Sequence, residues 1–362
     1  MEWIKGIGWM AVGLVAMAAG YAGLWGADRL IVASGIGNPF AQEAFKRGLQ
    51  FDTRTPLEFT SDAKATAPVY FVHALDGRIK VKGEPAVVFG GAANKRTYPC
   101  NEGGWPAFDS DDFGFTNPKG AWDRPELILL GDSFVEGMCQ PEGQRIADYL
   151  RKRYRVLNLA RAGAAPLSQL GILREYAPQN ATILWFITDN DFKGLADELK
   201  SPILPKYLEP GFTQGLRGKQ AWVNAVTRSE ATRIIQRHEW IGTLPGIKLY
   251  RLLMSWSIRD AIDLRRIIYR PDPVSEVAED FRKVLKAAGD VTMVYLHDHR
   301  KTGLSTHKYH IHQIARLAKL PLIDTTQKDG DPELLHQLGG HYSPLGNELV
   351  AESIIRGLDA PR

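Results

Sequence analysis

Short apolar runs alternate with amphipathic segments along much of the chain after residue 126. The apolar runs lie at 127–130, 156–160, 182–188, 291–297 and 321–324. The amphipathic segments have the apolar spacing that is typical of helices, and they lie at 143–154, 165–177, 276–289, 308–320 and 344–358. Strands that alternate with helices are joined by crossovers and therefore run parallel. The pattern predicts five strands in an open, doubly wound α/β sheet.

The N-terminal segment, residues 1–30, differs from the rest of the chain. No charged residue occurs from Gly6 to Ala27, and about 20 apolar residues are enough for a helix to cross the hydrocarbon core of a bilayer. Trp3 and Trp25 lie near its two ends, as aromatic residues do at membrane interfaces. We predict an uncleaved transmembrane helix with its N-terminus inside. A cleaved signal peptide is the alternative, and either one exports the remaining chain.

Two further intervals do not follow the strand–helix alternation. Residues 66–100 hold short alternating runs separated by Gly, Pro and Asn, which predict a small β-rich subdomain. Residues from about 192 to 272 are amphipathic and basic at helical spacing, which predicts a helical insertion facing either solvent or a membrane surface. We therefore expect a juxtamembrane and β-rich part over 31–125, followed by a main domain over 126–362 that contains the insertion.

Composition and charge exclude several classes of function. The chain has 362 residues, of which 44% are hydrophobic and 24% charged, as is ordinary for a globular protein. A net charge of +4 is too small to predict nucleic-acid binding. The sequence has no Walker-type loop and no GxGxxG, so we expect no nucleotide cofactor. Five histidines between His297 and His312 have no spacing that matches a strong zinc signature, so we expect no metal.

Polar residues follow several of the predicted strands, at the edge where sites form in open α/β sheets. Ser133 follows the first strand in Gly131-Asp132-Ser133, Gly163 follows the second, and Asn190 follows the third. His341 precedes the last predicted helix, with His336 as a local competitor. Each residue alone has a plain structural interpretation: for the serine it is the N-cap of the next helix.

Taken together, these four residues resemble the SGNH/GDSL hydrolase superfamily, in which serine, glycine, asparagine and histidine occur in this order. The resemblance extends to a membrane-anchored bacterial subgroup, on the segments YPCNEGG, GFTNPKG, GDSFVEGMCQ, NLARAGAAPL and LWFITDND. It implies a flavodoxin-like three-layer α/β/α core. It also implies a disulfide between Cys100 and Cys139, which an exported chain permits. The residues alone do not decide between this disulfide and two unpaired thiols.

The resemblance implies a role for each candidate residue. Ser133 is the nucleophile, and His341 is the base that takes its proton. The N–H groups of Ser133 and Gly163, with the side chain of Asn190, form the oxyanion hole. Asp191, next to that asparagine, is expected to organise its loop.

The family's usual acid is missing from its usual place. An aspartate commonly stands three residues before the histidine, and Leu338 occupies that position here. Asp324, Asp329 and Asp331 lie upstream of it, and we take Asp331 as the predicted acid. A Ser–His dyad helped by a backbone carbonyl is the alternative.

The function that the resemblance implies is serine-dependent ester hydrolysis without a cofactor. The expected substrate is an O-acyl, such as O-acetyl, group on an envelope glycan or lipid. The expected location is the bacterial inner membrane, single-pass, with the catalytic domain in the periplasm and possible contacts to envelope-assembly proteins. One alternative is an O-acyltransferase acting on a polysaccharide. Another is an inactive glycan-binding protein, which the missing acid at Leu338 favours.

Overall fold

The computed structural model describes residues 2–34, 38–54, 59, 79–81, 84–98, 101–242, 246, 249–250, 273–297, 306–327, 335–336, 338 and 340–360. The chain divides into two compact units. The first comprises Met1–Leu57 and Arg233–Arg270, and the second comprises Glu58–Thr232 and Pro271–Arg362. All the candidate site residues belong to the second unit.

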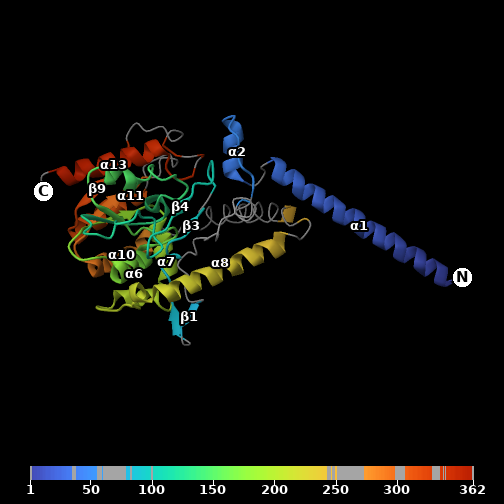
Figure 1. Ribbon diagram of the computed structural model, residues 1–362, viewed down its shortest axis with the longest axis horizontal. Coiled ribbons are helices and arrows are strands. Elements are labelled where there is room, and N and C mark those ends of the chain that lie inside the picture. The colour runs from blue at the N-terminus through green and yellow to red at the C-terminus, as the bar shows by residue number, and fades with distance from the viewer. Residues whose placement is uncertain are drawn as a thin grey trace. The chain divides into compact units, whose positions relative to one another are not determined.

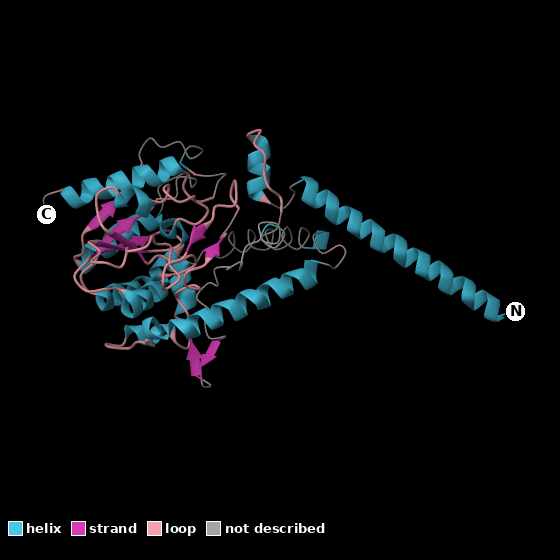
Figure 2. Cartoon of the chain, viewed as in Figure 1, coloured by secondary structure: helices cyan, strands magenta, loops and turns pink. Residues whose placement is uncertain are grey.

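The second unit is built on a five-stranded parallel sheet in the order β6-β5-β7-β8-β9 (Figure 2). The strands are β5 (Leu127–Leu130), β6 (Val156–Asn158), β7 (Thr182–Ile187), β8 (Thr292–Tyr295) and β9 (Leu322–Asp324). The predicted α/β class and the five parallel strands are confirmed. The chain reverses its direction of winding at β5, which has β6 on one side and β7 on the other. Such a reversal opens a crevice at the carboxyl ends of the strands.

Helices cover both faces of the sheet, because alternate strand residues point to opposite sides. On one face, residues such as Ile128 and Trp185 pack in a cluster with α6 (Pro166–Tyr176), α10 (Pro273–Ala288) and α11 (Thr306–Ala318). On the other face, residues such as Leu129 and Phe186 pack with α5 (Ile146–Arg151) and α13 (Pro344–Asp359). Figure 1 shows α13 and the pair α6 and α10 on opposite sides. Strands buried on both faces explain why these segments are continuous apolar runs rather than alternating ones.

The described part of the β-rich interval consists of short antiparallel pairs. Strand β1 (Ile79–Val81) pairs with β2 (Glu84–Ala86), and β3 (Arg96–Thr97) pairs with β4 (Phe108–Asp109). Residues 60–78, which belong largely to the same prediction, lie outside the described residues.

The described part of the predicted insertion is helical. It contains α7 (Asp191–Glu198), two 3-10 helices (Leu204–Leu208 and Leu216–Lys219) and α8 (Gln220–Gly242). Residues 243–245, 247–248 and 251–272 of that prediction lie outside the described residues.

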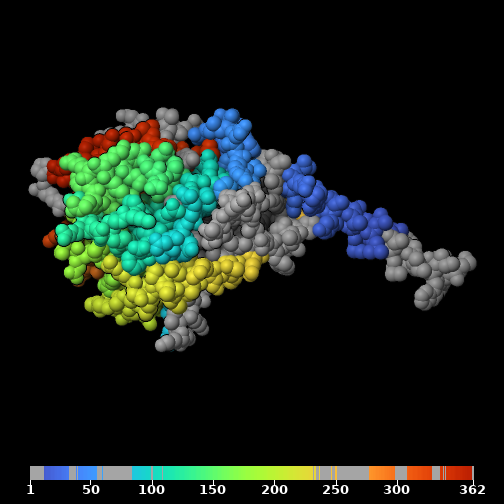
Figure 3. Space-filling model, viewed as in Figure 1, coloured from blue at the N-terminus to red at the C-terminus, as the bar shows by residue number. Residues whose placement is uncertain are grey.

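In the first unit, α1 (Glu2–Ser34) and α2 (Pro39–Lys46) are helices. Large apolar side chains of α1, including Leu14 and Val15, are exposed. The described part of α1 is dark blue in the space-filling view (Figure 3). Among the residues that the structure describes, no helix has the combined length and apolar character needed to cross a bilayer.

Edge strand β9 is joined to α11 through Asp324. Lys308 Nζ lies 2.8 Å from the Asp324 carboxylate, and His312 Nε2 lies 3.1 Å from it. Partial burial works to raise the pKa of Asp324, but hydrogen bonds from Lys308 and Thr326 outweigh it and lower the pKa to about 2. The ionised carboxylate is therefore stabilised in the folded state. Its contribution to the free energy of unfolding is lost as the pH falls through the lowered pKa of about 2.

We expect Asp324→Asn to reduce the free energy of unfolding by about 1–2 kcal/mol near neutral pH and by much less near pH 2. Urea unfolding at both pH values measures the difference. The control is Asp290→Asn, which changes an exposed aspartate just before β8. An equal loss of stability at both pH values would contradict the role of the ionised Asp324.

Candidate active site

Ser133 lies at the turn between the central strand β5 and the short helix α4 (Ser133–Glu136). The N-cap of α4 is Asp132, whose side chain accepts the N–H of Phe134 at 3.0 Å. The interpretation of Ser133 as an N-cap is therefore wrong. The serine is half-buried, and its own N–H has no acceptor within the described part of the chain. Its hydroxyl and its N–H are both available at the carboxyl edge of the sheet.

His341 lies against this serine, immediately before α13. Its Nε2 is 2.8 Å from Ser133 Oγ, and its Nδ1 is 2.8 Å from Glu102 Oε1. The backbone N–H of His341 donates to Glu102 Oε2 at 2.7 Å. These contacts fit an imidazole that donates from Nδ1 to the carboxylate and presents the lone pair of Nε2 to the serine hydroxyl. Ser133, His341 and Glu102 thus have the connectivity of a nucleophile–base–acid triad.

The carboxylate at the imidazole Nδ1 belongs to Glu102, which is not among the acids predicted from the sequence. Glu102 fills the position at Nδ1, and Asp331 and Asp329 lie outside the described residues. Asp324, the third candidate, is engaged with Lys308 and His312 on the far edge of the sheet. Leu338, at the family's usual acid position, is buried with a positive φ of 42°.

The Glu102 carboxylate is held on several sides. It is buried, with 7% of its side chain exposed. A Cβ added at Gly340 would lie 2.0 Å from its Oε2, so any other residue before His341 would push the carboxylate from this position. Cys139, six residues past the serine, is disulfide-bonded, and its Sγ is 3.7 Å from His341 Nδ1. Cys100, the other cysteine of the sequence, lies outside the described residues.

A sequence signal for Glu102 existed. The predicted partner of Cys139 is Cys100, and Glu102 follows Cys100 by two residues. A bridge between these cysteines would bring the glutamate close to the turn that carries Ser133. The disulfide and the acid could therefore have been predicted together.

The second histidine, His336, supports the turn that leads to His341. It is buried, and its Nδ1 lies 3.1 Å from the carbonyl oxygen of Gly340. Phe134, the residue after the nucleophile, packs its ring 4.8 Å from the His341 ring and 5.1 Å from that of Tyr342. Gln140 donates to the Tyr342 carbonyl at 2.7 Å. These contacts fix the imidazole without placing His336 at the serine.

The residues predicted for the oxyanion hole follow the strands on either side of β5. Gly163, after β6, has a φ of +74°, which favours glycine, and its N–H has no acceptor among the described residues. Asn190, after β7, is exposed, and its side-chain amide lies 3.4 Å from Asp132 Oδ2. Donors from three neighbouring strand ends thus lie along the edge that carries the serine. Such donors can stabilise a negative oxygen that forms there.

Two buried aspartates organise these turns. Asp132 Oδ2 accepts from Thr188 Oγ1 at 3.2 Å, which joins the turn after β5 to the turn after β7. Asp191 accepts the Thr188 N–H at 2.6 Å, in line with the structural role predicted for it. Burial raises the pKa of Asp132, and burial together with the neighbouring Asp132 carboxylate raises that of Asp191 well above its usual value.

Among the described residues, three side chains near Ser133 have the spacing of metal ligands but not the chemistry of a metal site. Glu102, Cys139 and His341 have potential ligand atoms within 4.8 Å of one another. A sulfur in a disulfide is not a thiolate, and only the thiolate is an effective metal ligand. The imidazole Nδ1 is already committed to the glutamate.

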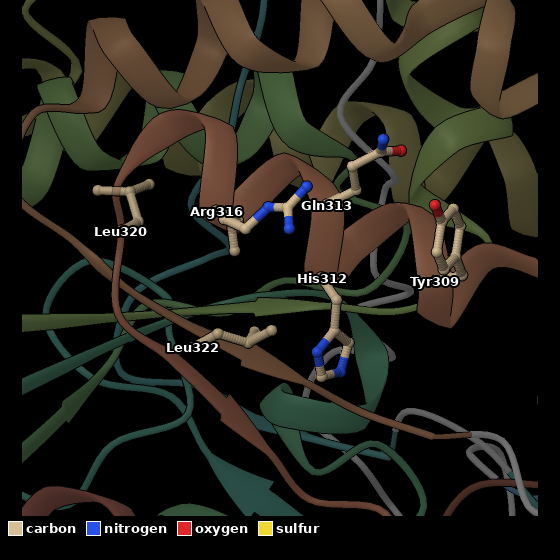
Figure 4. Close-up of a pocket in the computed structure, with 7 residues that line it drawn as sticks. Tyr309, His312, Gln313, Arg316, Leu320 and Leu322 are labelled. Atoms are coloured by element: carbon tan, nitrogen blue, oxygen red, sulfur yellow. The ribbon is translucent and has the colours of Figure 1, made fainter.

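A hollow of about 420 Å³ lies elsewhere, between α11 and the segment leading into β9. Figure 4 shows Tyr309, His312 and Arg316 projecting from α11 around it. Its lining contains no member of the set formed by Ser133, His341 and Glu102.

Comparison of the chain with protein-family models and with curated proteins finds no match.

Proposed function

We propose that this protein is a serine-dependent ester hydrolase of the SGNH/GDSL type. The observation that carries the proposal is the pair of 2.8 Å contacts that His341 makes, through Nε2 to Ser133 and through Nδ1 to Glu102. Counted from β5, the strand order is 2-1-3-4-5, which is the flavodoxin-like order and supports the proposed three-layer core. The inactive alternative rested on the absence of an acid at Leu338. Because Glu102 supplies a carboxylate to His341, that absence no longer favours an inactive protein.

The proposed reaction proceeds through an acyl-enzyme. Ser133 Oγ attacks the ester carbonyl carbon while His341 Nε2 takes the hydroxyl proton. The negatively charged oxygen accepts hydrogen bonds from the backbone N–H groups of Ser133 and Gly163 and from the side-chain amide of Asn190. The carbon–oxygen bond then breaks, and His341 gives its proton to the leaving alcohol. Water attacks the acyl-enzyme with His341 again as the base, which releases the carboxylic acid and restores the serine.

The substrate class and the location are proposed on the resemblance of the sequence segments. We propose an O-acyl or O-acetyl group on an envelope glycan or lipid, and a periplasmic catalytic domain tethered by an N-terminal membrane segment. The bridge from Cys139 to Cys100 belongs to the same proposal, since a disulfide persists in an oxidising compartment.

A fluorophosphonate probe tests the proposed activity without knowledge of the natural substrate. Such probes phosphonylate an activated serine hydroxyl and leave ordinary serines unmodified. We expect mass mapping of the labelled full-length protein to place the adduct on Ser133. No adduct, or an adduct on another serine, would contradict the proposal.

A further inference from the structure

The loop that carries Gly163 is held between two carboxylates, that of the buried Glu136 and that of the half-buried Glu198. On one side, Ala162 donates its N–H to Glu136 Oε2 at 2.7 Å. On the other side, Ala165 donates its N–H to Glu198 Oε1 at 3.1 Å. Gly163 lies between these two anchored residues, and its own N–H is left without an acceptor in the described part of the chain. The orientation of that N–H therefore depends on both carboxylates.

Each carboxylate belongs to a helix that begins at another oxyanion donor. Glu136 is the last residue of α4, which begins at Ser133. Glu198 is the last residue of α7, whose N-cap is Asn190. Each helix therefore links one donor at its start to the Gly163 loop at its end.

The Glu136 side is reinforced by a buried ion pair. Arg161, which precedes the loop, places Nη1 3.2 Å from Glu136 Oε1 and 3.3 Å from the carbonyl oxygen of Gly114. Both side chains are almost fully buried, at 3% and 2% exposed. Substitution here would leave a buried charge without its partner, so Glu136 is a poor site for a mutational test.

The Glu198 side is a cap on α6, the helix that follows the loop. Besides Ala165, the carboxylate accepts the N–H of Leu167 at 2.8 Å and of Ser168 at 3.2 Å through Oε2. A Cβ added at Gly194 of α7 would lie 2.5 Å from the Cβ of Ala165, so the two segments are in close contact. Burial raises the pKa of Glu198 to about 7.

Gln169 also connects α6 and the Gly163 loop to α7. Gln169 of α6 donates to the carbonyl oxygen of Ala164 at 3.0 Å and to Asp191 at 3.1 Å. Its carbonyl oxygen in turn accepts the indole N–H of Trp185. The loop after Gly163 is thus fixed to the first residue of α7 as well as to its last.

We infer that Glu198 is a positioning residue that sets the Gly163 N–H in register with the donors on Ser133 and Asn190. The inference rests on the proposed function, because it assigns Gly163 to the oxyanion hole. Glu198 touches no reacting atom and acts through the backbone of the loop. Its loss should therefore weaken binding of the transition state more than binding of the substrate.

The test compares Glu198→Gln with wild type in the full-length protein, at about pH 8.5, where the wild-type carboxylate is ionised. An amide retains one accepting oxygen but places an NH₂ group against N–H donors, so the loop must shift. The control is Asp197→Asn on the same helix, whose carboxylate pairs with Lys200 at the surface. The readouts are kcat and KM for p-nitrophenyl acetate, and the Ki of a trifluoromethyl ketone that forms a tetrahedral adduct on serine.

For Glu198→Gln we expect kcat to fall at least about tenfold with KM little changed, because removal of a whole oxyanion donor costs about 10²–10³-fold. The Ki of the ketone should rise by the same factor as kcat/KM falls, and Asp197→Asn should match wild type. A merely structural cap would lower Tm and leave kcat and Ki unchanged, and that result would overturn the inference.

A second variant serves if Glu198→Gln does not fold. Glu198→Asp keeps the charge and draws the oxygens back by about one C–C bond, roughly 1.5 Å. We expect it to fold and to show a smaller fall in kcat than Glu198→Gln, with a rise in Ki that is smaller by the same factor. An unchanged kcat would again overturn the inference. If wild type itself hydrolyses no ester and takes no label, the proposed function fails. An active wild type with an equally active Glu198→Gln refutes the inference alone.

Discussion

Replacement of Ser133 by alanine is expected to lower kcat for ester hydrolysis by about 10⁶-fold, because the proposed attacking atom is removed. The residual rate should come from the oxyanion donors and from substrate binding, which the substitution leaves in place. KM should change little. The measurement is hydrolysis of p-nitrophenyl acetate by the purified full-length protein, with the folded fraction checked by circular dichroism.

The matched control for this loss is Ser229→Ala, which changes an exposed serine on α8. It should retain the wild-type rate. Appreciable hydrolysis by Ser133→Ala would contradict the role of this serine, since the ester would then be cleaved in the absence of the proposed nucleophile.

Glu102→Gln is expected to lower kcat by about 10⁴-fold, which is the loss typical when a triad acid becomes an amide. The amide can present its NH₂ group to the imidazole, which favours the tautomer protonated on Nε2. That tautomer cannot accept the Ser133 proton, although every heavy atom stays close to its place. The loss should appear in kcat and in the rate of fluorophosphonate labelling alike.

The control for the acid is Glu352→Gln, on the exposed face of α13, where the carboxylate lies 3.6 Å from Arg356. A Glu102→Gln protein that folds normally and keeps wild-type kcat would show that His341 needs no carboxylate. The dyad alternative would then describe the site.

The sheet could be predicted from the sequence because the burial of each strand is visible in that strand's own residues. Strands buried on both faces must be apolar throughout, so β5 and β7 are visible as the runs LILL and TILWFI. The order of polar residues after these strands also follows directly from the chain. Ser133, Gly163, Asn190 and His341 were therefore found by position.

The triad acid could not be found in that way, because it comes from a distant part of the chain. Glu102 and His341 are separated by 239 positions, and the glutamate lies in a loop rather than at a strand end. The family that the sequence resembles commonly has an aspartate shortly before the histidine, and that resemblance points to Asp331 rather than to Glu102. The two cysteines were the only pattern that connected this loop to the Ser133 turn.

The positioning of the oxyanion loop was equally hidden. Glu136 and Glu198 look like ordinary polar residues near helix ends, and no sequence pattern distinguishes them from exposed ones such as Glu352. Their role depends on how the chain folds around them. The first backbone N–H groups of α6 and those of the turn before it have no acceptor within the helix, and these carboxylates supply one. Tertiary contacts of this kind are not visible in a single sequence.

The central claim is that Glu102 holds the His341 imidazole in the tautomer that can accept the Ser133 proton. The most direct measurement is the ¹⁵N NMR spectrum of histidine-labelled protein at alkaline pH, with His341→Gln used to assign the signals. We predict that Nδ1 of His341 is protonated and Nε2 is not, both in wild type and in Ser133→Ala, and that this tautomer is lost in Glu102→Gln. A His341 protonated on Nε2 in wild type, or a spectrum unchanged by Glu102→Gln, would contradict the claim.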